Sequence, residues 1–126
     1  MSVTVVDASA IAAVVFDEPE AAPLVAAVHG GLLAPSLIRY ELANVCATKL
    51  RREPGAAQRT LSRYRLLQDL DLRTVESDWD LLPELASRWR LTGYDAAYLQ
   101  VALQAGLPLL TLDARLAKAY ERASRA

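Results

Sequence analysis

The first structural unit of the chain is predicted by the stretch VTVVDASA, residues 3–10. Val3–Val6 is a β-branched run that favours a short strand, and Ala8–Phe16 has the composition of a buried helix. A strand followed at once by a helix is the repeating unit of parallel α/β folds. Asp7 stands at the junction of the two elements, where it interrupts an otherwise apolar segment.

The same alternation of strands and helices continues along the chain. The expected helix ends are marked by Gly30, Pro54 and Gly106. The remaining strands are predicted at residues 32–34, 72–75 and 107–112, and the remaining helices at residues 19–28, 36–52, 54–70, 78–89, 95–105 and 114–122. Ser36 is expected to cap the helix that begins there. The pattern predicts an α/β fold in which helices flank a central short parallel sheet of four or five strands.

Length and composition limit the class of protein. The 126 residues are expected to form a single domain, residues 1–126. Cys46, the only cysteine, excludes an intrachain disulfide and lies on an apolar helical face, as a small core residue does. The N-terminus lacks the basic start and apolar stretch of a secretory signal, and no segment approaches the roughly 18 uninterrupted apolar residues of a membrane span. We expect a cytoplasmic protein that does not associate with membranes.

Four acids interrupt apolar segments of the chain: Asp7, Glu41, Asp95 and Asp113. A buried carboxylate must be neutralised, paired or metal-bound, because a bare buried charge is costly even after the protein relaxes around it. No Lys, Arg or His accompanies all four acids. Carboxylate oxygens without matched cations are typical ligands of Mg²⁺ and Mn²⁺. The sequence therefore predicts a site for a divalent metal ion.

The predicted elements bring these acids to one place. Asp7 and Asp113 are each expected to follow the last residue of a strand, so both lie at the carboxyl edge of the sheet, where open α/β folds place their sites. Asp95 opens the helix that leads into the final strand, and Glu41 lies one turn inside the helix after the second strand. Two such charges about 4 Å apart repel by roughly 4 kcal/mol at an effective dielectric constant of 20, which favours bound cations or protons.

A simpler interpretation remains open for each acid. Asp7, Asp95 and Asp113 all precede predicted helices, and an Asp at a helix start is often only a cap. Glu41 is inside a helix, where the simple alternative is a solvated side chain. The coincidence of four acids in apolar surroundings, with a small hydroxyl residue two positions from Asp7 and another two positions from Asp113, favours a shared site.

The acids lie in four short motifs: VVDASA at residues 5–10, YELANV at 40–45, YDAAYLQVA at 94–102 and LTLDARL at 110–116. In this order they resemble the successive motifs of the PIN-domain ribonucleases, over nearly the whole chain. Length and motif spacing are most similar to the VapC toxins of bacterial toxin–antitoxin pairs, which are small stand-alone PIN proteins neutralised by a partner protein.

The resemblance implies a PIN-like sheet, a Mg²⁺ or Mn²⁺ site at its carboxyl edge, endonucleolytic cleavage of RNA, a homodimer and a cognate antitoxin. The positions that match the family's acidic quartet are Asp7, Glu41, Asp95 and Asp113, and those that match its supporting polar residues are Ser9, Asn44 and Thr111. Two alternatives stay open: a stand-alone PIN nuclease in RNA processing, and an RNA-binding subunit that does not cleave. In one departure, many relatives end in a further short strand, whereas residues 119–126 favour a helix and a basic tail.

The acids also suggest a division of roles. Asp7 and Asp95 are expected to be direct metal ligands, and Asp113 to bind through water or a second ion. Glu41 is expected to orient or deprotonate the attacking water.

The basic residues are unevenly distributed. Residues 39–65 hold seven Lys and Arg against two acids, whereas residues 1–38 hold four acids and no Lys or Arg. The basic stretch is either a set of solvated helix faces or a phosphate-binding surface. In the second case the candidate RNA contacts are Arg51, Arg52, Arg59 and Arg63.

Other conspicuous residues support no competing site. His29 is expected at a helix C-terminus, where a contact with the helix dipole is simpler than catalysis. Trp79 and Trp89 are expected to pack in the protein or at an interface. Phosphoryl transfer through an aspartyl-phosphate is the main rival chemistry, but no second acid stands two residues after Asp7, and Lys118 lies inside a helix.

Overall fold

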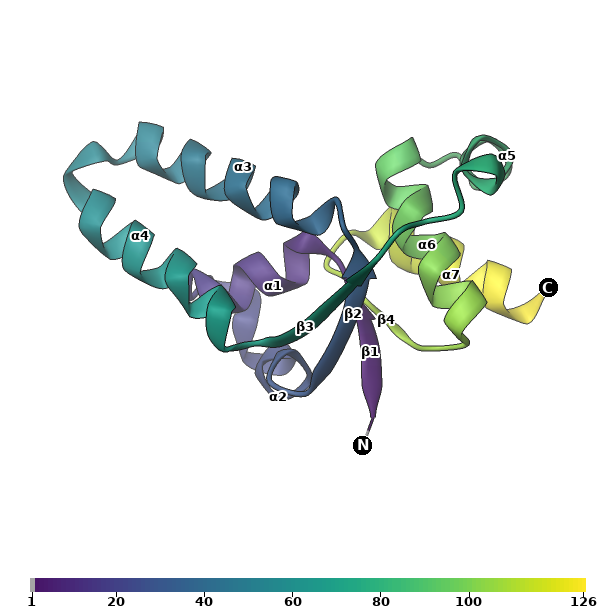
Figure 1. The fold of residues 1–126 in the computed structure, drawn as a ribbon, viewed down its shortest axis with the longest axis horizontal. Helices are drawn as coiled ribbons and strands as arrows, with labels where there is room; N and C mark the ends of the chain where they lie inside the picture. The colour runs from purple at the N-terminus through teal and green to yellow at the C-terminus, as the bar shows by residue number, and fades with distance from the viewer. Residues whose placement is uncertain (1) are drawn as a thin grey trace.

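The computed structural model of the protein describes residues 2–126, in which four parallel strands are flanked by helices (Figure 1). The strands are β1 (Val3–Val6), β2 (Gly31–Pro35), β3 (Asp71–Val75) and β4 (Leu109–Leu110). They lie side by side in the order β3-β2-β1-β4, and each neighbouring pair is parallel. The predicted α/β class and central parallel sheet are confirmed.

The helices follow the predicted alternation with adjusted boundaries. The α-helices of the described residues are α1 (Ala8–Val15), α2 (Val25–Val28), α3 (Ile38–Arg52), α4 (Ala57–Arg65), α5 (Leu82–Trp89), α6 (Gly93–Ala105) and α7 (Ala114–Arg125), and the 3-10 segments are η1 (Pro19–Leu24), η2 (Pro54–Ala56), η3 (Leu66–Asp69) and η4 (Trp79–Leu81). The helix predicted at residues 19–28 is thus mostly 3-10, and Pro23, which has no N–H to donate, lies inside that part. Residues 119–126 contain no strand, as the sequence predicted, and α7 ends at Arg125, beyond its predicted end at residue 122.

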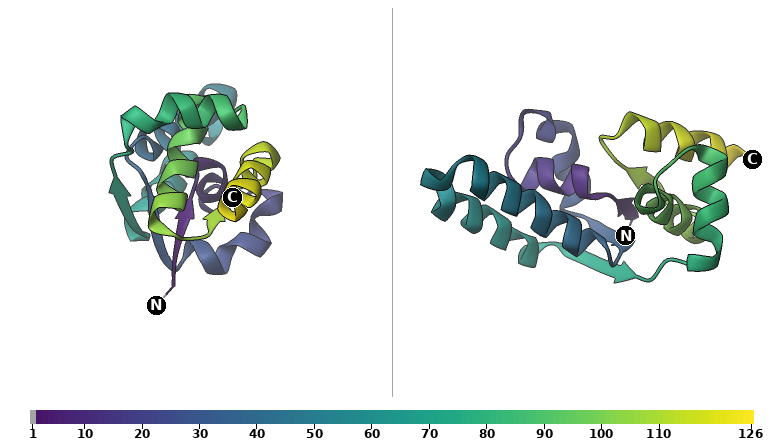
Figure 2. Two further views of the ribbon diagram at one scale, coloured as in Figure 1. Left: turned by 90° about the vertical axis from the view of Figure 1, so that its right-hand side faces the viewer. Right: turned by 90° about the horizontal axis from the view of Figure 1, so that it is seen from above.

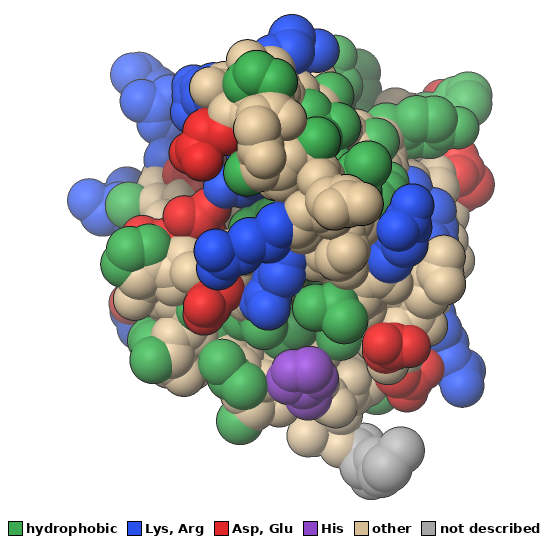
Figure 3. Space-filling view, turned by 90° about the vertical axis from the view of Figure 1, so that its left-hand side faces the viewer, with side chains coloured by type: hydrophobic (Ala, Val, Ile, Leu, Met, Phe, Trp, Pro, Cys, Tyr) green, Lys and Arg blue, Asp and Glu red, His purple; other side chains and the backbone are tan. Residues whose placement is uncertain are grey.

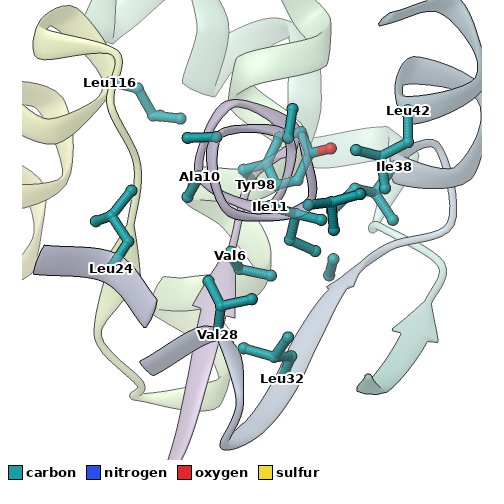
Figure 4. Close-up of a cluster of buried hydrophobic side chains, with 14 of the residues drawn as sticks. Val6, Ala10, Ile11, Leu24, Val28, Leu32, Ile38, Leu42, Tyr98 and Leu116 are labelled. Atoms are coloured by element: carbon teal, nitrogen blue, oxygen red, sulfur yellow. The ribbon is translucent and has the colours of Figure 1, made fainter. Parts of the chain in front are cut away.

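Helices lie on both faces of the sheet (Figure 2), and a buried apolar cluster lies on each face. Val6 and Leu32 share one face and pack in the larger buried cluster with side chains of α1, α2 and α3 (Figure 4). Val5 lies on the opposite face and packs against Val101 and Ala102 of α6. Alternate residues of β1 therefore serve two apolar layers, which accounts for its continuous run of β-branched and apolar residues.

Helix α6 contains the longest unbroken run of buried residues among the described helices. Each residue from Ala96 to Ala102 is buried, because the helix contacts β1 and β2 as well as α5 and α7. A helix enclosed on several sides is apolar around most of its circumference, as this one is. Its N-terminal end, which carries Asp95, points to the carboxyl edge of the sheet because the helix leads into the parallel strand β4.

Two local predictions were wrong. Ser36 does not cap α3: the position before the helix is Leu37, without a side-chain cap, and the Ser36 hydroxyl donates to Glu76 instead. The strand predicted at residues 107–112 is reduced to Leu109 and Leu110, which pair with Val5 and Val6. Asp113 therefore lies three residues beyond the strand rather than directly after it.

The other conspicuous residues of the sequence lie in buried, exposed and helix-end positions. Cys46 is buried, and Trp89 packs against the core, as expected. Trp79 is exposed, so for this residue packing inside the protein is excluded. His29 ends α2, the position that was predicted for it. Within residues 2–126, no helix combines the length and the apolar character that crossing a membrane requires.

Candidate active site at the carboxyl edge of the sheet

Asp7 is held by hydrogen bonds at the end of the central strand β1. Its side chain is only 5% exposed. Oδ1 accepts from the Ser9 hydroxyl at 2.7 Å and from the Ala10 N–H at 3.1 Å, and Oδ2 accepts from the Thr111 hydroxyl. Asp7 does cap α1, as the simple interpretation proposed, but the bond to Thr111 comes from a distant part of the chain. Asp7 therefore caps α1 and also belongs to a polar cluster that includes Thr111.

The two hydroxyls that bond Asp7 also fix the loop after β4. Ser9 Oγ accepts from the Leu112 N–H at 3.0 Å, and Thr111 Oγ1 accepts from the Asp113 N–H at 2.9 Å. This arrangement links the end of β1 to the start of α7, so the position of Asp7 and the position of Asp113 are set by one network.

Glu41 reaches the edge from the first turn of α3. The buried phenol of Tyr98 on α6 donates a hydrogen bond to its Oε1, and Figure 4 shows the Tyr98 oxygen directed toward α3. Burial raises the pKa of Glu41 above its usual value, and repulsion by Asp95 and Asp7 adds to this rise, while the bond from Tyr98 lowers it. Burial also raises the pKa of Tyr98, with the Glu41 carboxylate adding to the rise, so the phenol stays a proton donor to the carboxylate.

Asp95 lies in the first turn of α6 but does not cap it. Thr92 is the cap, and its hydroxyl accepts from the Asp95 N–H at 3.1 Å. Burial raises the pKa of Asp95, and so does repulsion by Asp113 and Asp7, while Arg115 and the bond with Thr92 lower it. The capping interpretation is thus wrong for Asp95, whose side chain is left available to the edge.

Asp113 and Asn44 lie at the rim of this cluster. Asp113 is exposed and caps α7 by accepting from the N–H groups of Arg115 at 2.9 Å and Leu116 at 3.2 Å. Asn44 is also exposed, one turn along α3 from Glu41, and lines the same hollow as Glu41. Both residues face solvent more than the buried Asp7 does.

Electrostatics joins the acids into one group. Repulsion from Asp7 acts on both Glu41 and Asp95, and Asp113 acts on Asp95. Neither Asp7 nor Glu41 has an ion pair with Lys or Arg within residues 2–126. The cluster therefore has an excess of negative charge that protons or a cation can relieve.

The donor set fits a hard divalent cation. All candidate ligand atoms at this edge are oxygens of Asp, Glu or Asn side chains, which suit Mg²⁺ or Mn²⁺ better than a soft metal. In the part of the chain that the structure describes, no three His, Cys, Asp or Glu side chains lie close enough together to hold an ion jointly. Asp7 and Asp95 are the residues that would hold such an ion, and Mg²⁺ commonly keeps several water ligands.

Two of the predicted basic residues, Arg51 and Arg52, lie at the opposite end of α3 from Glu41, about 16 Å along the helix axis, and the other two, Arg59 and Arg63, lie on α4. We call Arg51, Arg52 and Arg59 the basic arm; all three are exposed near the turn between α3 and α4. Figure 3 views the molecule from this side and shows several groups of Lys and Arg on its surface. Arg63 differs, because its Nε donates to the Val15 carbonyl at 2.6 Å and so helps to end α1.

Sequence reasoning missed three tyrosines at the site. Tyr98 holds Glu41, while Tyr40 and Tyr94, the residues before Glu41 and Asp95, line a hollow together with Glu41. A signal for Tyr98 was present: it stands three residues after Asp95 in a predicted helix, a spacing that puts two side chains on the same face.

Comparisons with known proteins agree with the observed α/β fold. The crystal structure of PAE2754 from Pyrobaculum aerophilum is similar, with a TM-score of 0.69, 26% sequence identity, and coverage of 98% of this chain and 93% of that chain. No curated protein sequence gives a significant match. The sequence profile of the family described as PIN domain matches residues 4–122, which include all four acids. The chain therefore belongs to the PIN domain family.

Proposed function

We propose that this protein is an endoribonuclease that hydrolyses RNA phosphodiester bonds at the acid cluster with Mg²⁺ or Mn²⁺. PIN domains are generally nucleases, and they typically use divalent metal ions. The observation that carries the proposal is the gathering of Asp7, Glu41 and Asp95 at the carboxyl edge of the sheet, where neither Asp7 nor Glu41 forms an ion pair with Lys or Arg within residues 2–126. Such a cluster is costly for folding unless a cation uses it.

Each acid has a role that follows from its surroundings. Asp7 and Asp95 would hold the ion, since Asp7 is fixed by hydrogen bonds and Asp95 by its buried helix, and Asp113 at the rim would act through water or a second ion. When bound, the ion would supply Lewis-acid polarisation of the phosphate and a more acidic water.

Glu41 is the residue best suited to handle a proton. Its raised pKa brings it closer to neutral pH than an exposed glutamate, which improves a general base. The Tyr98 phenol occupies Oε1, so Oε2 is the oxygen left to accept a proton from the attacking water. Tyr98 thereby acts as a positioning residue, because it fixes the direction of the carboxylate.

The test is RNA cleavage by the purified full chain, with labelled unstructured RNA, in Mg²⁺ or Mn²⁺ and in excess chelator. We expect cutting only with the metal ion. Asp7→Asn and Asp95→Asn should each reduce cutting at least about 100-fold. Asp69→Asn, which changes an exposed acid on η3, is the matched control and should cut normally. Undiminished cutting in chelator would contradict the metal requirement, and equal cutting by the site variants would point to a contaminating nuclease.

We further propose that the protein is the toxin of a VapBC-type pair and acts as a homodimer in the cytoplasm. The proposal rests on the length of the chain and the spacing of its motifs, which resemble those toxins. A cognate antitoxin would inhibit it by inserting Arg or Lys into the acid cluster, where a cation can take the place of the metal ion.

Expression in a bacterial host distinguishes this role from the alternatives. The unsubstituted chain should stop growth, Asp95→Asn should not, and co-expression of a protein encoded beside it should restore growth. In the antitoxin, replacing the inserted cation by alanine should release RNA cutting while the complex survives. A chain that cuts RNA in the test tube but is harmless when expressed alone would favour a stand-alone RNA-processing nuclease. A chain that binds RNA without cutting it would favour a non-cleaving subunit.

A further inference from the structure

Each of two acids at the site is preceded by a strongly exposed tyrosine. Tyr40, before Glu41, is 79% exposed, and Tyr94, before Asp95, is 67% exposed. One lies on α3 and the other on α6, yet both line the same two hollows in the surface. The two tyrosines therefore line one depression from two different helices, and Glu41 lines it with them.

The two hollows form one continuous trough. They share Leu37, Tyr40 and Tyr94; the first, of about 400 Å³, ends at Glu41 and Asn44, and the second, of about 370 Å³, extends to Trp79. Trp79 is itself 72% exposed. We call this surface the aromatic trough. It runs from the proposed general base to an indole, and each hollow is as large as those that bind small ring compounds.

The charged residues that line the aromatic trough favour uncharged groups over phosphates. Among the described residues that line it, Glu41 and Glu76 are the charged ones, and none is Lys or Arg. Phosphate groups are repelled by such a surface, whereas the uncharged flat face of a nucleobase is not. Aromatic side chains bind bases by stacking, with little dependence on base identity.

We propose that the aromatic trough is a base-stacking subsite that holds unpaired bases of a single-stranded RNA next to the bond to be cut. This inference rests on the proposed RNA-cleaving function and adds the form of the substrate. Tyr40 and Tyr94 take the base nearest the acid cluster between them, and Trp79 takes a base farther along the strand. The sugar-phosphate backbone stays outside, where it can reach the acid cluster with its metal ion. Paired bases are stacked inside a duplex and cannot enter the trough.

A second protein chain is the rival occupant. An apolar segment or another copy of this chain could also cover exposed aromatic rings. The continuity of the trough with Glu41 argues for the substrate, because whatever fills it lies beside the proposed catalytic group.

The test is a double-mutant cycle between protein and RNA. Binding of a labelled single-stranded oligoribonucleotide to the full chain is measured by fluorescence anisotropy, in chelator and again in Mg²⁺. Tyr40→Ala, Tyr94→Ala and Trp79→Ala are compared with Leu66→Ala, which removes an exposed apolar side chain outside the trough. The same oligonucleotides are made with one base at a time replaced by an abasic site.

We expect each aromatic-to-alanine change to weaken binding by about 5- to 140-fold, the range of one lost base stack. An abasic site at the RNA position that stacks on the substituted residue should weaken binding by a similar factor. Combining the substitution with that abasic site should weaken binding no further, because both changes remove the same stack. Tyr40→Phe and Tyr94→Phe should bind normally, since the ring is kept, and a blunt duplex should bind weakly and ignore the substitutions. Leu66→Ala should have no effect.

Three results would overturn the proposal. The first is that the affinity losses from the alanine substitutions and from the abasic sites add at every abasic position, and the second is that the unsubstituted chain does not bind single-stranded RNA in either buffer. The third is that the alanine substitutions convert a dimer to a monomer while RNA affinity stays unchanged. The last result would assign the trough to a protein interface. Because the readout is binding, a chain that fails to cut RNA but shows the expected cycle would refute the cleavage proposal alone. A chain that cuts RNA without any effect of the tyrosines would refute this one alone.

Discussion

The phenol of Tyr98 on α6 donates a hydrogen bond to the Glu41 carboxylate on α3, although 57 residues separate the two in the sequence. The pKa of Glu41, the proposed general base, therefore depends on two opposing effects. Burial and the neighbouring acids raise it, and the hydrogen bond from Tyr98 lowers it.

Tyr98→Phe removes that donor. The pKa of Glu41 should rise further, so the acid limb of the kcat–pH profile should move to higher pH. The plateau of kcat should fall about 10-fold, less than the roughly 10²–10⁴-fold expected for Glu41→Gln, because the base is still present but is less well directed. Tyr120→Phe is the matched control, since it loses a phenol bond to the Leu107 carbonyl away from the acids. A profile that coincides with that of Tyr120→Phe would show that Tyr98 does not tune Glu41.

Asp95→Asn should stabilise the metal-free protein at neutral pH. The folded-state pKa of Asp95 is raised, so its ionisation opposes folding. Below the unfolded pKa of about 3.9 the two proteins should melt alike, and the advantage of the variant should grow as pH rises through the higher folded value. Because Asp95 is only half-buried and solvent screens it, the gain should be small, about 1–3 °C in Tm. Thermal denaturation from pH 3 to 7 measures it, and a lower Tm at pH 7 would contradict the repulsion.

Mg²⁺ or Mn²⁺ should raise the Tm of the unsubstituted chain by relieving the same repulsion. Binding to the folded state alone adds about 2.7 kcal/mol at a ligand concentration of 100 times Kd. Asp95→Asn should lose most of this metal-dependent increase, while Asp69→Asn should keep it. Differential scanning calorimetry across a metal titration measures both effects. An equal increase in all three proteins would place the binding ion elsewhere.

The basic arm should affect RNA binding through phosphate contacts. Each of Arg51→Ala, Arg52→Ala and Arg59→Ala that removes one contact should flatten the dependence of log affinity on log salt by about 0.7 for a single strand. Binding isotherms at several salt concentrations measure the slope. If the slope of log affinity against log salt concentration is the same for the variants and the unsubstituted chain, these arginines are solvated residues that do not contact RNA.

Arg63→Ala should behave differently from the three arginines of the basic arm. Its guanidinium donates to the Val15 and Val14 carbonyls at 2.6 and 3.4 Å, so the substitution leaves the end of α1 without these donors. We expect a loss of about 1–2 kcal/mol in the free energy of unfolding, measured by urea denaturation. A protein of unchanged stability with a flatter salt dependence would return Arg63 to the RNA-binding set.

The parts of the fold that could be predicted from the sequence depend on neighbouring residues. Val3–Val6 forms the predicted strand, and Gly106 ends α6 with the positive φ of 66° that glycine adopts easily. The parts that failed depend on distant partners. Ser36 looked like a helix cap, but its hydroxyl bonds Glu76, 40 residues away.

The candidate site shows the same limit. The place of Asp7 at a strand end could be predicted, because it needs only the strand and helix on either side of it. The pairing of Tyr98 with Glu41 could not, because it depends on how α6 lies against α3. The Thr92 cap of α6 is different: it is local, since the Thr92 hydroxyl accepts from the N–H of Asp95 three residues later, and sequence reasoning missed it because it considered Asp95 as the cap.

The hydrogen bond between Thr111 and Asp7 joins residues 104 positions apart, near the two ends of the described chain. During synthesis on a ribosome, Asp7 is added 104 residues before Thr111. Neither β4 nor the loop that fixes Asp7 exists before then. A nascent chain that has not reached Asp113 therefore lacks the complete acid cluster, although it already contains Asp7, Glu41 and Asp95. The order of synthesis thus delays assembly of the proposed active site until all four strands have been made.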